Sequence, residues 1–102
     1  MAIQKRHMHV SEKVGRDAED ALIAAYIEPH PAKRGIAYYR LKEENGGYPV
    51  WAIIGDLAPG ILSEEDIMRE FRISREMLDA VLAYYARNKE AIDAWLMVNR
   101  MG

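Results

Sequence analysis

The sequence contains no cysteine, so the chain can form neither a disulfide bond nor a zinc site with thiolate ligands. No apolar run approaches the roughly 20 residues that a membrane-spanning helix needs. The basic residues near the N-terminus are not followed by the apolar stretch of a secretory signal. With 102 residues, the chain is long enough to bury a core of its own. We therefore expect a single soluble domain in the cytoplasm.

Residue patterns that carry enzyme chemistry are also scarce. His7 and His9 could hold a metal ion only with further ligands, and we interpret them as a solvated pair. The carboxylates at 64–66 fall in the expected first turn of a helix, where negative charge is stabilising. The turn at 43–47 lacks the lysine and the following helix of a phosphate-binding loop. We therefore expect no catalytic residues, no metal site and no cofactor.

The most informative pattern that is present is a helix-turn-helix spacing at 63–82. Ser63 and Ser74 each precede a stretch of helical periodicity, where a serine hydroxyl can accept a hydrogen bond from the free N–H groups of the first turn. Ile73 lies in the short link and is expected to hold the two helices at a steep angle. The apolar stripes are Ile67, Met68 and Phe71 in the first helix and Leu78, Val81, Leu82 and Tyr85 in the second.

The flanking segments complete a mainly α fold, a helix-turn-helix bundle with one short β-hairpin. Pro29 and Pro31 should end an early helix whose buried face consists of Ala18, Ala21, Leu22, Ala25 and Tyr26. Two β-prone runs flank the turn Asn45-Gly46-Gly47, which predicts the hairpin. Asn88 should cap the last helix. The predicted parts are an N-terminal arm (1–16), a helix (17–28), a hairpin (36–51), the helix-turn-helix region (50–86) and a terminal helix (88–101).

The terminal helix has more apolar surface than docking on one domain requires. At about 100° per residue its apolar side chains cover well more than half of the circumference, and Asn99 stands alone among them. Such a surplus favours an interface over deep burial in so small a domain. We expect a two-fold homodimer or a partner protein to bury this surface. The predicted interface residues are Trp95, Leu96 and Val98, with Tyr38 and Tyr39 facing opposite sides of a strand.

The charge distribution bears on whether the second helix reads DNA. Residues 1–42 carry a net charge of +3 and residues 43–102 carry −5, so the motif lies in the acidic part. A DNA-reading element normally carries the basic surface. The candidates for phosphate contacts are Arg69, Arg72 and Arg75, with Lys5 and Arg6 on the arm. The residues expected on the outward face of the second helix, which would meet the DNA, are Arg75, Glu76, Asp79, Ala83 and Ala86.

Two residues also depart from a DNA-reading motif. Met68 stands where a small residue usually lets the helices approach, and Arg72 stands where glycine usually takes the tight turn. A motif that serves only as a packing unit is at least as consistent with this sequence as one that reads DNA.

Four segments resemble a family catalogued as domain of unknown function four-three-three, whose members are regarded as VapB-type antitoxins or antitoxin-like proteins. These segments are 28–40, 49–55, 63–71 and 81–93. The resemblance implies a homeodomain-like helix-turn-helix fold preceded by a hairpin. It also implies a small PIN-like ribonuclease toxin as the partner. Members often carry G-T-R where this chain has Gly46-Gly47-Tyr48.

The function that we predict is a non-catalytic antitoxin-like protein that neutralises such a toxin and also regulates its own operon. Because a PIN-like active site is rich in carboxylates, a blocking residue should be basic, and Arg87 and Arg100 are the candidates. The alternative is a dimeric helix-turn-helix transcriptional regulator without a toxin partner.

Overall fold

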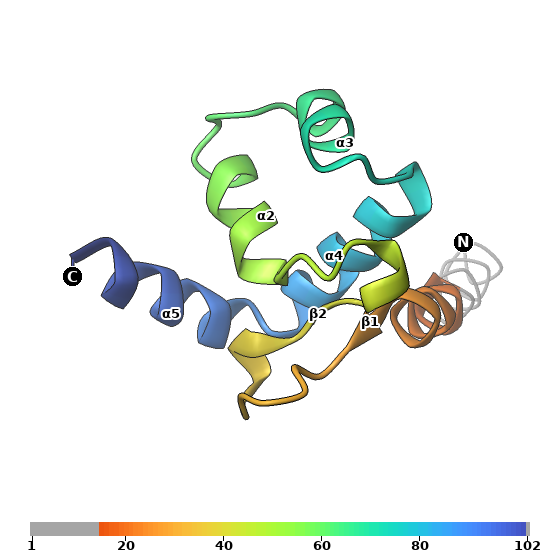
Figure 1. Ribbon diagram of the computed structural model, residues 1–102, viewed down its shortest axis with the longest axis horizontal. Coiled ribbons are helices and arrows are strands. Elements are labelled where there is room, and N and C mark those ends of the chain that lie inside the picture. Colours follow the sequence, from red (N-terminus) through yellow and green to blue (C-terminus); the bar gives the residue numbers. More distant parts are fainter. Residues whose placement is uncertain (1–14, 102) are drawn as a thin grey trace, which may run out of the picture.

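The computed structural model describes residues 15–101, with side chains through Asn99. Figure 1 shows short helices packed around one another, with the N-terminal helix at one end and α5 extending from the other. The described range is mainly helical, as predicted, and contains one short two-stranded sheet. Its elements are a helix over 15–26, β1 (Ile27–Glu28), η1 (Ile36–Tyr38), β2 (Arg40–Leu41), η2 (Glu43–Asn45), α2 (Val50–Leu57), α3 (Glu64–Phe71), α4 (Arg75–Arg87) and α5 (Lys89–Met101).

The two serine caps predicted for the central helix pair are confirmed. The Ser63 hydroxyl oxygen accepts the N–H of Asp66 at 3.1 Å, and the Asp66 carboxylate accepts the N–H of Ser63 at 3.3 Å. This reciprocal pair is a capping box that begins α3. Ser74 caps α4 by accepting the N–H of Met77 at 3.2 Å. Ile73 is buried in the link between the two helices, as the motif requires.

The core lies where α2 meets the other helices. Every helix from α2 to α5 contributes at least one side chain with no exposed surface or almost none. Burying each of these large aliphatic groups stabilises the fold by about 1.5–3 kcal/mol before entropy is counted. The most deeply buried side chains are Leu41, Val50, Ile53, Ile54, Ile67, Leu78, Val81 and Ile92.

The hairpin predicted at 36–51 is wrong in its pairing. The two-stranded sheet joins β2 to β1, and its register sets Ile27 opposite Leu41 and Glu28 opposite Arg40. The chain does reverse after η2, but the pairing there is a single bridge between Arg40 and Pro49. Pro49 has no N–H to extend a ladder, and α2 begins at the next residue.

The N-terminal helix also differs from its prediction. It ends at Tyr26 instead of Glu28, because the next two residues form β1. Residues 15 and 16, which the sequence assigns to the arm, are already helical. Of the face predicted to be buried, the three alanines are exposed, and only Leu22 and Tyr26 pack against the core, together with Ile23. The helix therefore touches the domain along a narrow edge, and the rest of the arm lies outside the described residues.

Two details of α4 and α5 refine the sequence analysis. Asn88 occupies the N-cap position of α5, since its carbonyl accepts the N–H of Ile92 at 3.1 Å. Its side chain instead donates to the carbonyl of Tyr84 at 3.0 Å and so closes α4. Ala83 is buried and does not belong to the outward face predicted for α4. None of the helices within 15–101 is long and apolar enough to cross a lipid bilayer.

Arg72 ends α3 in the left-handed region, with φ of 54°. We expect Arg72→Gly to raise the free energy of unfolding by up to about 1 kcal/mol. Glycine removes the strain of the left-handed conformation, and this gain exceeds the free-energy cost of the greater conformational freedom of glycine in the unfolded chain. Chemical denaturation measures this change. The control Arg69→Gly, inside α3 and exposed, should lower the free energy of unfolding by about 1 kcal/mol. Equal losses in both variants would contradict the expectation.

Candidate functional site

One side of α5 packs against its own domain. The Trp95 ring centroid lies 4.3 Å from that of Trp51 and 5.9 Å from that of Tyr38, and the Trp95 and Tyr38 rings are nearly perpendicular. Leu96 packs over Gly55, where an added Cβ would lie 3.5 Å from its Cδ2 atom. Of the predicted interface residues, Trp95 therefore packs against α2 and η1 of its own domain, and Leu96 packs against α2.

Tyr38 and Tyr39 are likewise engaged within the domain, which corrects their placement on a strand with opposite exposed faces. Tyr38 belongs to η1, and Tyr39 stacks on Tyr84 with ring centroids 5.1 Å apart. The Tyr84 hydroxyl donates to the carbonyl of Ile36 at 2.8 Å, which ties η1 to α4. Burial raises the pKa of Tyr84 well above its usual range, and the nearby Tyr39 adds a smaller effect in the same direction.

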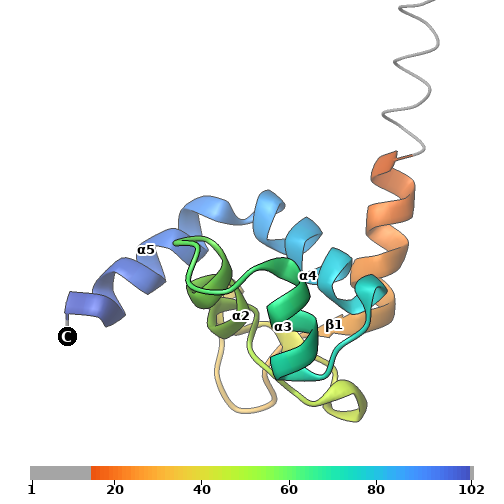
Figure 2. The same cartoon turned by 90° about the horizontal axis from the view of Figure 1, so that it is seen from above.

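The other side of α5 retains exposed apolar surface, which we call the apolar face of α5. The side chains of Met97 and Val98 are 65% and 69% exposed. Figure 2 shows the C-terminal half of α5 extending beyond the other helices. Asn99 does not add a free polar group, since its amide donates to the carbonyl of Trp95 at 2.8 Å. The apolar face of α5 consists of Ala91, Ala94, Met97 and Val98.

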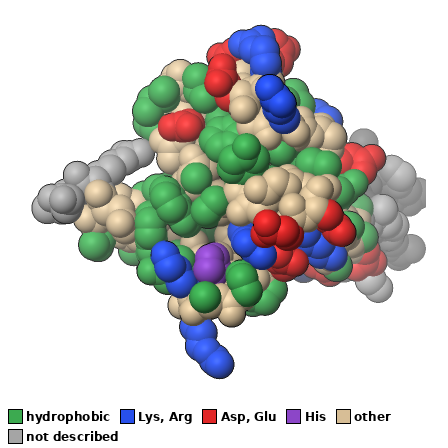
Figure 3. Space-filling model, in the orientation of Figure 1, with side chains coloured by type: hydrophobic (Ala, Val, Ile, Leu, Met, Phe, Trp, Pro, Cys, Tyr) green, Lys and Arg blue, Asp and Glu red, His purple; other side chains and the backbone are tan. Residues whose placement is uncertain are grey.

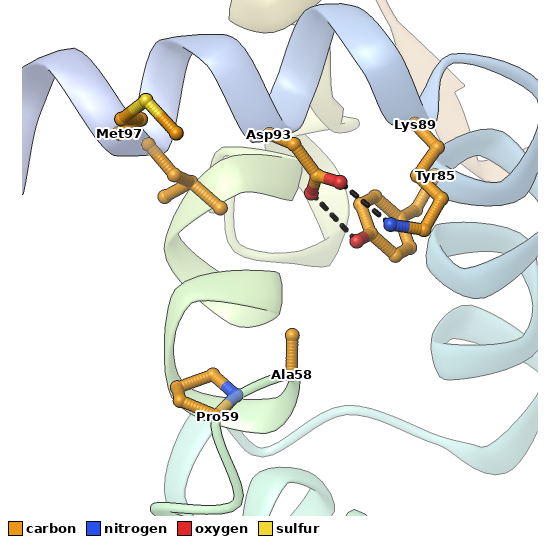
Figure 4. Close-up of a pocket in the computed structure, with 7 residues that line it drawn as sticks. Ala58, Pro59, Tyr85, Lys89, Asp93 and Met97 are labelled. Atoms are coloured by element: carbon orange, nitrogen blue, oxygen red, sulfur yellow. Dashed lines mark hydrogen bonds and ion pairs between the residues drawn. The ribbon is translucent and has the colours of Figure 1, made fainter.

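A groove of about 520 Å³ runs between this helix and the end of α2 (Figure 4). Its apolar walls are Ala58, Pro59, Leu96 and Met97. At its polar end the Tyr85 hydroxyl donates to Asp93 Oδ1 at 2.7 Å, and Lys89 Nζ lies 2.6 Å from Asp93 Oδ2.

The charged groups at the polar end of the groove are paired with each other. The Lys89 ammonium first, and the Tyr85 hydroxyl second, lower the pKa of the Asp93 carboxyl by hydrogen bonding. The same carboxylate raises the pKa of Tyr85. The carboxylate is therefore an ion-paired anchor that holds the start of α5 against α4.

The N-terminal helix contacts α4 near both of its ends, while Arg75, Glu76 and Ala86 of the predicted outward face remain exposed. The Tyr26 hydroxyl donates to Glu76 Oε2 at 2.8 Å at the start of α4, and Figure 2 shows the two segments side by side. At the other end of α4, the Arg87 guanidinium pairs with Asp20 and with Glu19 and donates to the carbonyl of Arg16 at 3.1 Å. The helix that would read DNA therefore presents a face already contacted by another part of the chain.

Two of the arginines predicted to contact phosphate form ion pairs within the domain. Arg69 pairs with Asp66, and Arg75 pairs with Glu64 and, at 3.2 Å, with Asp79. Arg72 is exposed, and none of the described carboxylates lies within ion-pair distance of it. The remaining DNA-contact candidates, Lys5 and Arg6, lie outside the described residues, as do His7 and His9.

The two candidates for blocking a toxin site are Arg87 and Arg100, and only the side chain of Arg87 is described. Arg87 is committed to Asp20 and Glu19, a contact that the sequence could not reveal because 67 residues separate Arg87 from Asp20. The side chain of Arg100 lies outside the described part of α5. Among residues 15–101 no group of three or more His, Asp or Glu side chains is arranged to hold a metal ion.

Comparisons with protein-family models, with curated proteins and with solved structures find no match to this chain.

We expect Trp95→Ala to lower the free energy of unfolding by at least about 2 kcal/mol, because it removes the contacts with Trp51 and Tyr38. Val98→Ala, on the exposed side of the same helix, should change it by no more than about 0.5 kcal/mol. Denaturation curves and light scattering of both variants test this. A Trp95→Ala variant that keeps its stability but dissociates a dimer would restore Trp95 to an intermolecular interface.

We also expect Arg87→Ala to accelerate amide hydrogen exchange in residues 17–26, while amides of α2 keep their protection. The substitution removes the ion pairs that hold the start of the N-terminal helix to α4. Arg69→Ala is the matched control, since its ion pair lies within α3. Unchanged exchange in Arg87→Ala would mean that the apolar contacts of Leu22, Ile23 and Tyr26 alone hold this helix.

Proposed function

We propose that this chain is a non-catalytic antitoxin-like protein that binds and neutralises a small PIN-like ribonuclease. The observation that carries the proposal is the apolar face of α5, which includes two large side chains, Met97 and Val98, each about two-thirds exposed. Apolar surface presented on one side of a helix is typical of a helix that docks into a partner's groove.

The groove beside this helix supports the same proposal. Its walls share Met97 with the apolar face of α5, so that one partner could contact both without a gap. The paired Asp93 and Lys89 at the polar end leave no uncompensated charge to be buried. A partner would gain apolar contact along the walls of the groove, while Asp93 and Lys89 would stay paired at its polar end.

The resemblance of segments 28–40, 49–55, 63–71 and 81–93 to antitoxin-like proteins supplies the nature of the partner. The capped pair α3–α4 fits the homeodomain-like helix-turn-helix that the resemblance implies. Regulation of its own operon would use this pair.

The alternative, a transcriptional regulator without a toxin partner, has less support. Arg69 and Arg75 are held by carboxylates of α3 and α4, and phosphates would have to displace these contacts. The outer side of α4 would also have to lose its contacts with the N-terminal helix. Protein binding is therefore the function that the geometry supports better.

The test needs a small PIN-like ribonuclease, which would be sought first among the products of the neighbouring genes. We expect Met97→Asp, Val98→Asp to weaken binding at least tenfold, about 1.4 kcal/mol, because two carboxylates would be buried against an apolar partner surface. Calorimetric titration measures the affinity, and an RNA-cleavage assay measures inhibition.

The matched control is Ala18→Asp, Ala21→Asp, which adds the same charge to exposed positions of the N-terminal helix. This control should bind as the unmodified protein does. If the unmodified protein neither binds nor inhibits the ribonuclease at micromolar concentration, the proposed function is wrong. Binding to operator DNA alone would favour the alternative.

A further inference from the structure

A second cavity, of about 490 Å³, lies at the segment between β1 and η1. It is lined by residues 29–35 and by Tyr39, and none of these residues is acidic. Its volume falls within the range of about 300–1,000 Å³ that is usual for small-molecule sites. It shares no residue with the apolar face of α5 or with the groove beside that helix. The cavity is therefore a candidate site separate from the protein-binding surface proposed above.

The cavity carries two positive charges that the domain does not neutralise. Lys33 and Arg34 line it, and within residues 15–99 no carboxylate lies within ion-pair distance of either one. The carboxylate nearest to them along the chain, that of Glu28, is held by Arg40 at 3.0 Å. The Lys33 ammonium lies 5.5 Å from the centroid of the Tyr38 ring, a contact that positions the charge without neutralising it.

Uncharged donors line the same cavity. The Nδ1 atom of His30 accepts the N–H groups of Ala32 and Lys33, each at 3.0 Å, so the proton of the neutral ring lies on Nε2. That Nε2–H group, the Tyr39 hydroxyl and the backbone N–H of Arg34 have no hydrogen-bond partner among the described residues. All of them can donate to the oxygen atoms of an anion.

The segment that carries these groups is held in one conformation. The two hydrogen bonds to His30 tie its middle to its start. Pro29 and Pro31 fix their own φ angles. Gly35 ends the segment with φ of 127°, a conformation that a residue with a side chain rarely adopts. Little backbone entropy would therefore be lost when a ligand binds.

The cavity also offers apolar contact and is open to solvent. Pro29, Pro31 and Ala32 are exposed and contribute apolar walls. In Figure 3 the histidine reaches the surface beside Lys and Arg side chains and beside hydrophobic ones. A ligand with an anionic group and a small organic part could therefore use both kinds of surface.

We propose that this cavity binds a small organic molecule through a phosphate monoester group, which Lys33 and Arg34 contact. A phosphate monoester carries about −1.5 to −2 charges near neutral pH, which matches two cations better than the single charge of a carboxylate does. The planar guanidinium of Arg34 can bind two phosphate oxygens at once, and the ammonium of Lys33 supplies a compact charge. The inference does not depend on the ribonuclease partner.

A small phosphorylated molecule fits the cavity better than nucleic acid does. Affinity for nucleic acid grows with the number of phosphates neutralised, and two adjacent cations supply few contacts. Residues 43–102 carry a net charge of −5, which is unfavourable for a long polyanion. Five other described cations are already ion-paired, namely Arg40, Arg69, Arg75, Arg87 and Lys89.

The test is a titration with phenyl phosphate, followed through the backbone amide signals of the protein by NMR. We expect signals of residues 29–39 to shift and to saturate at millimolar concentration. Lys33→Gln, Arg34→Gln should weaken binding at least tenfold, because it removes both charge-assisted contacts. The matched control Arg16→Gln, Arg72→Gln removes the same charge from exposed residues outside the cavity and should bind as the unmodified protein does. Circular dichroism verifies the fold of each variant.

Two variants of His30 test whether the held segment forms part of the site. The side-chain oxygen of an asparagine can accept the same N–H groups, whereas alanine has no acceptor. We therefore expect His30→Ala to weaken binding by about threefold and His30→Asn to restore most of the loss. A His30→Ala variant that binds phenyl phosphate as tightly as the unmodified protein would overturn the role of the held conformation.

Two further probes define the ligand. Inorganic phosphate should shift the same signals but bind more weakly, and benzyl alcohol should not shift them. Absence of a response to phenyl phosphate at millimolar concentration would overturn the inference, as would equal weakening by both double variants. Equal binding of benzyl alcohol would also overturn it, because the site would then be purely apolar. A single-stranded oligonucleotide that shifts these signals where phenyl phosphate does not would reassign the site to nucleic acid. None of these outcomes depends on whether the chain binds a ribonuclease.

Discussion

The burial of α2 is the constraint on which the rest of the structure depends. This helix has eight residues, and Val50, Ile53 and Ile54 are almost completely buried. It contacts α3, α4, α5 and η1, so each of these elements takes its position from the same surface. A helix this short has little stability alone. It persists because its neighbours enclose it, and they in turn bury their own apolar stripes against it.

Sequence reasoning succeeded where the determining contacts are local. Ser63 and Ser74 cap helices through bonds to N–H groups three residues away, so their role can be predicted from spacing alone. The hairpin failed for the opposite reason. The partner of β2 is β1, which follows the N-terminal helix directly, and two-residue strands leave too short a pattern to predict. Whether such a short sheet forms depends on which two segments pair with each other, and not on the β propensity of either segment alone.

The sequence predicted that α5 has exposed apolar surface, but not which of its residues are exposed. Periodicity indicated correctly that α5 carries more apolar residues than its own domain can bury. Which of them face outward depends on how the helix docks on α2, and that choice places Trp95 inside and Val98 outside. Charge pairing is equally non-local, because the partner of Arg87 lies on the N-terminal helix.

The two parts of the proposed interface have different physical roles. Apolar contact on α5 can supply affinity, because it removes exposed side chains such as Val98 from water at no electrostatic cost. It discriminates poorly, since many proteins offer apolar grooves. The polar end of the groove, where Lys89 pairs with Asp93, adds orientation and selectivity, because only a partner with polar groups in the matching place gains from it.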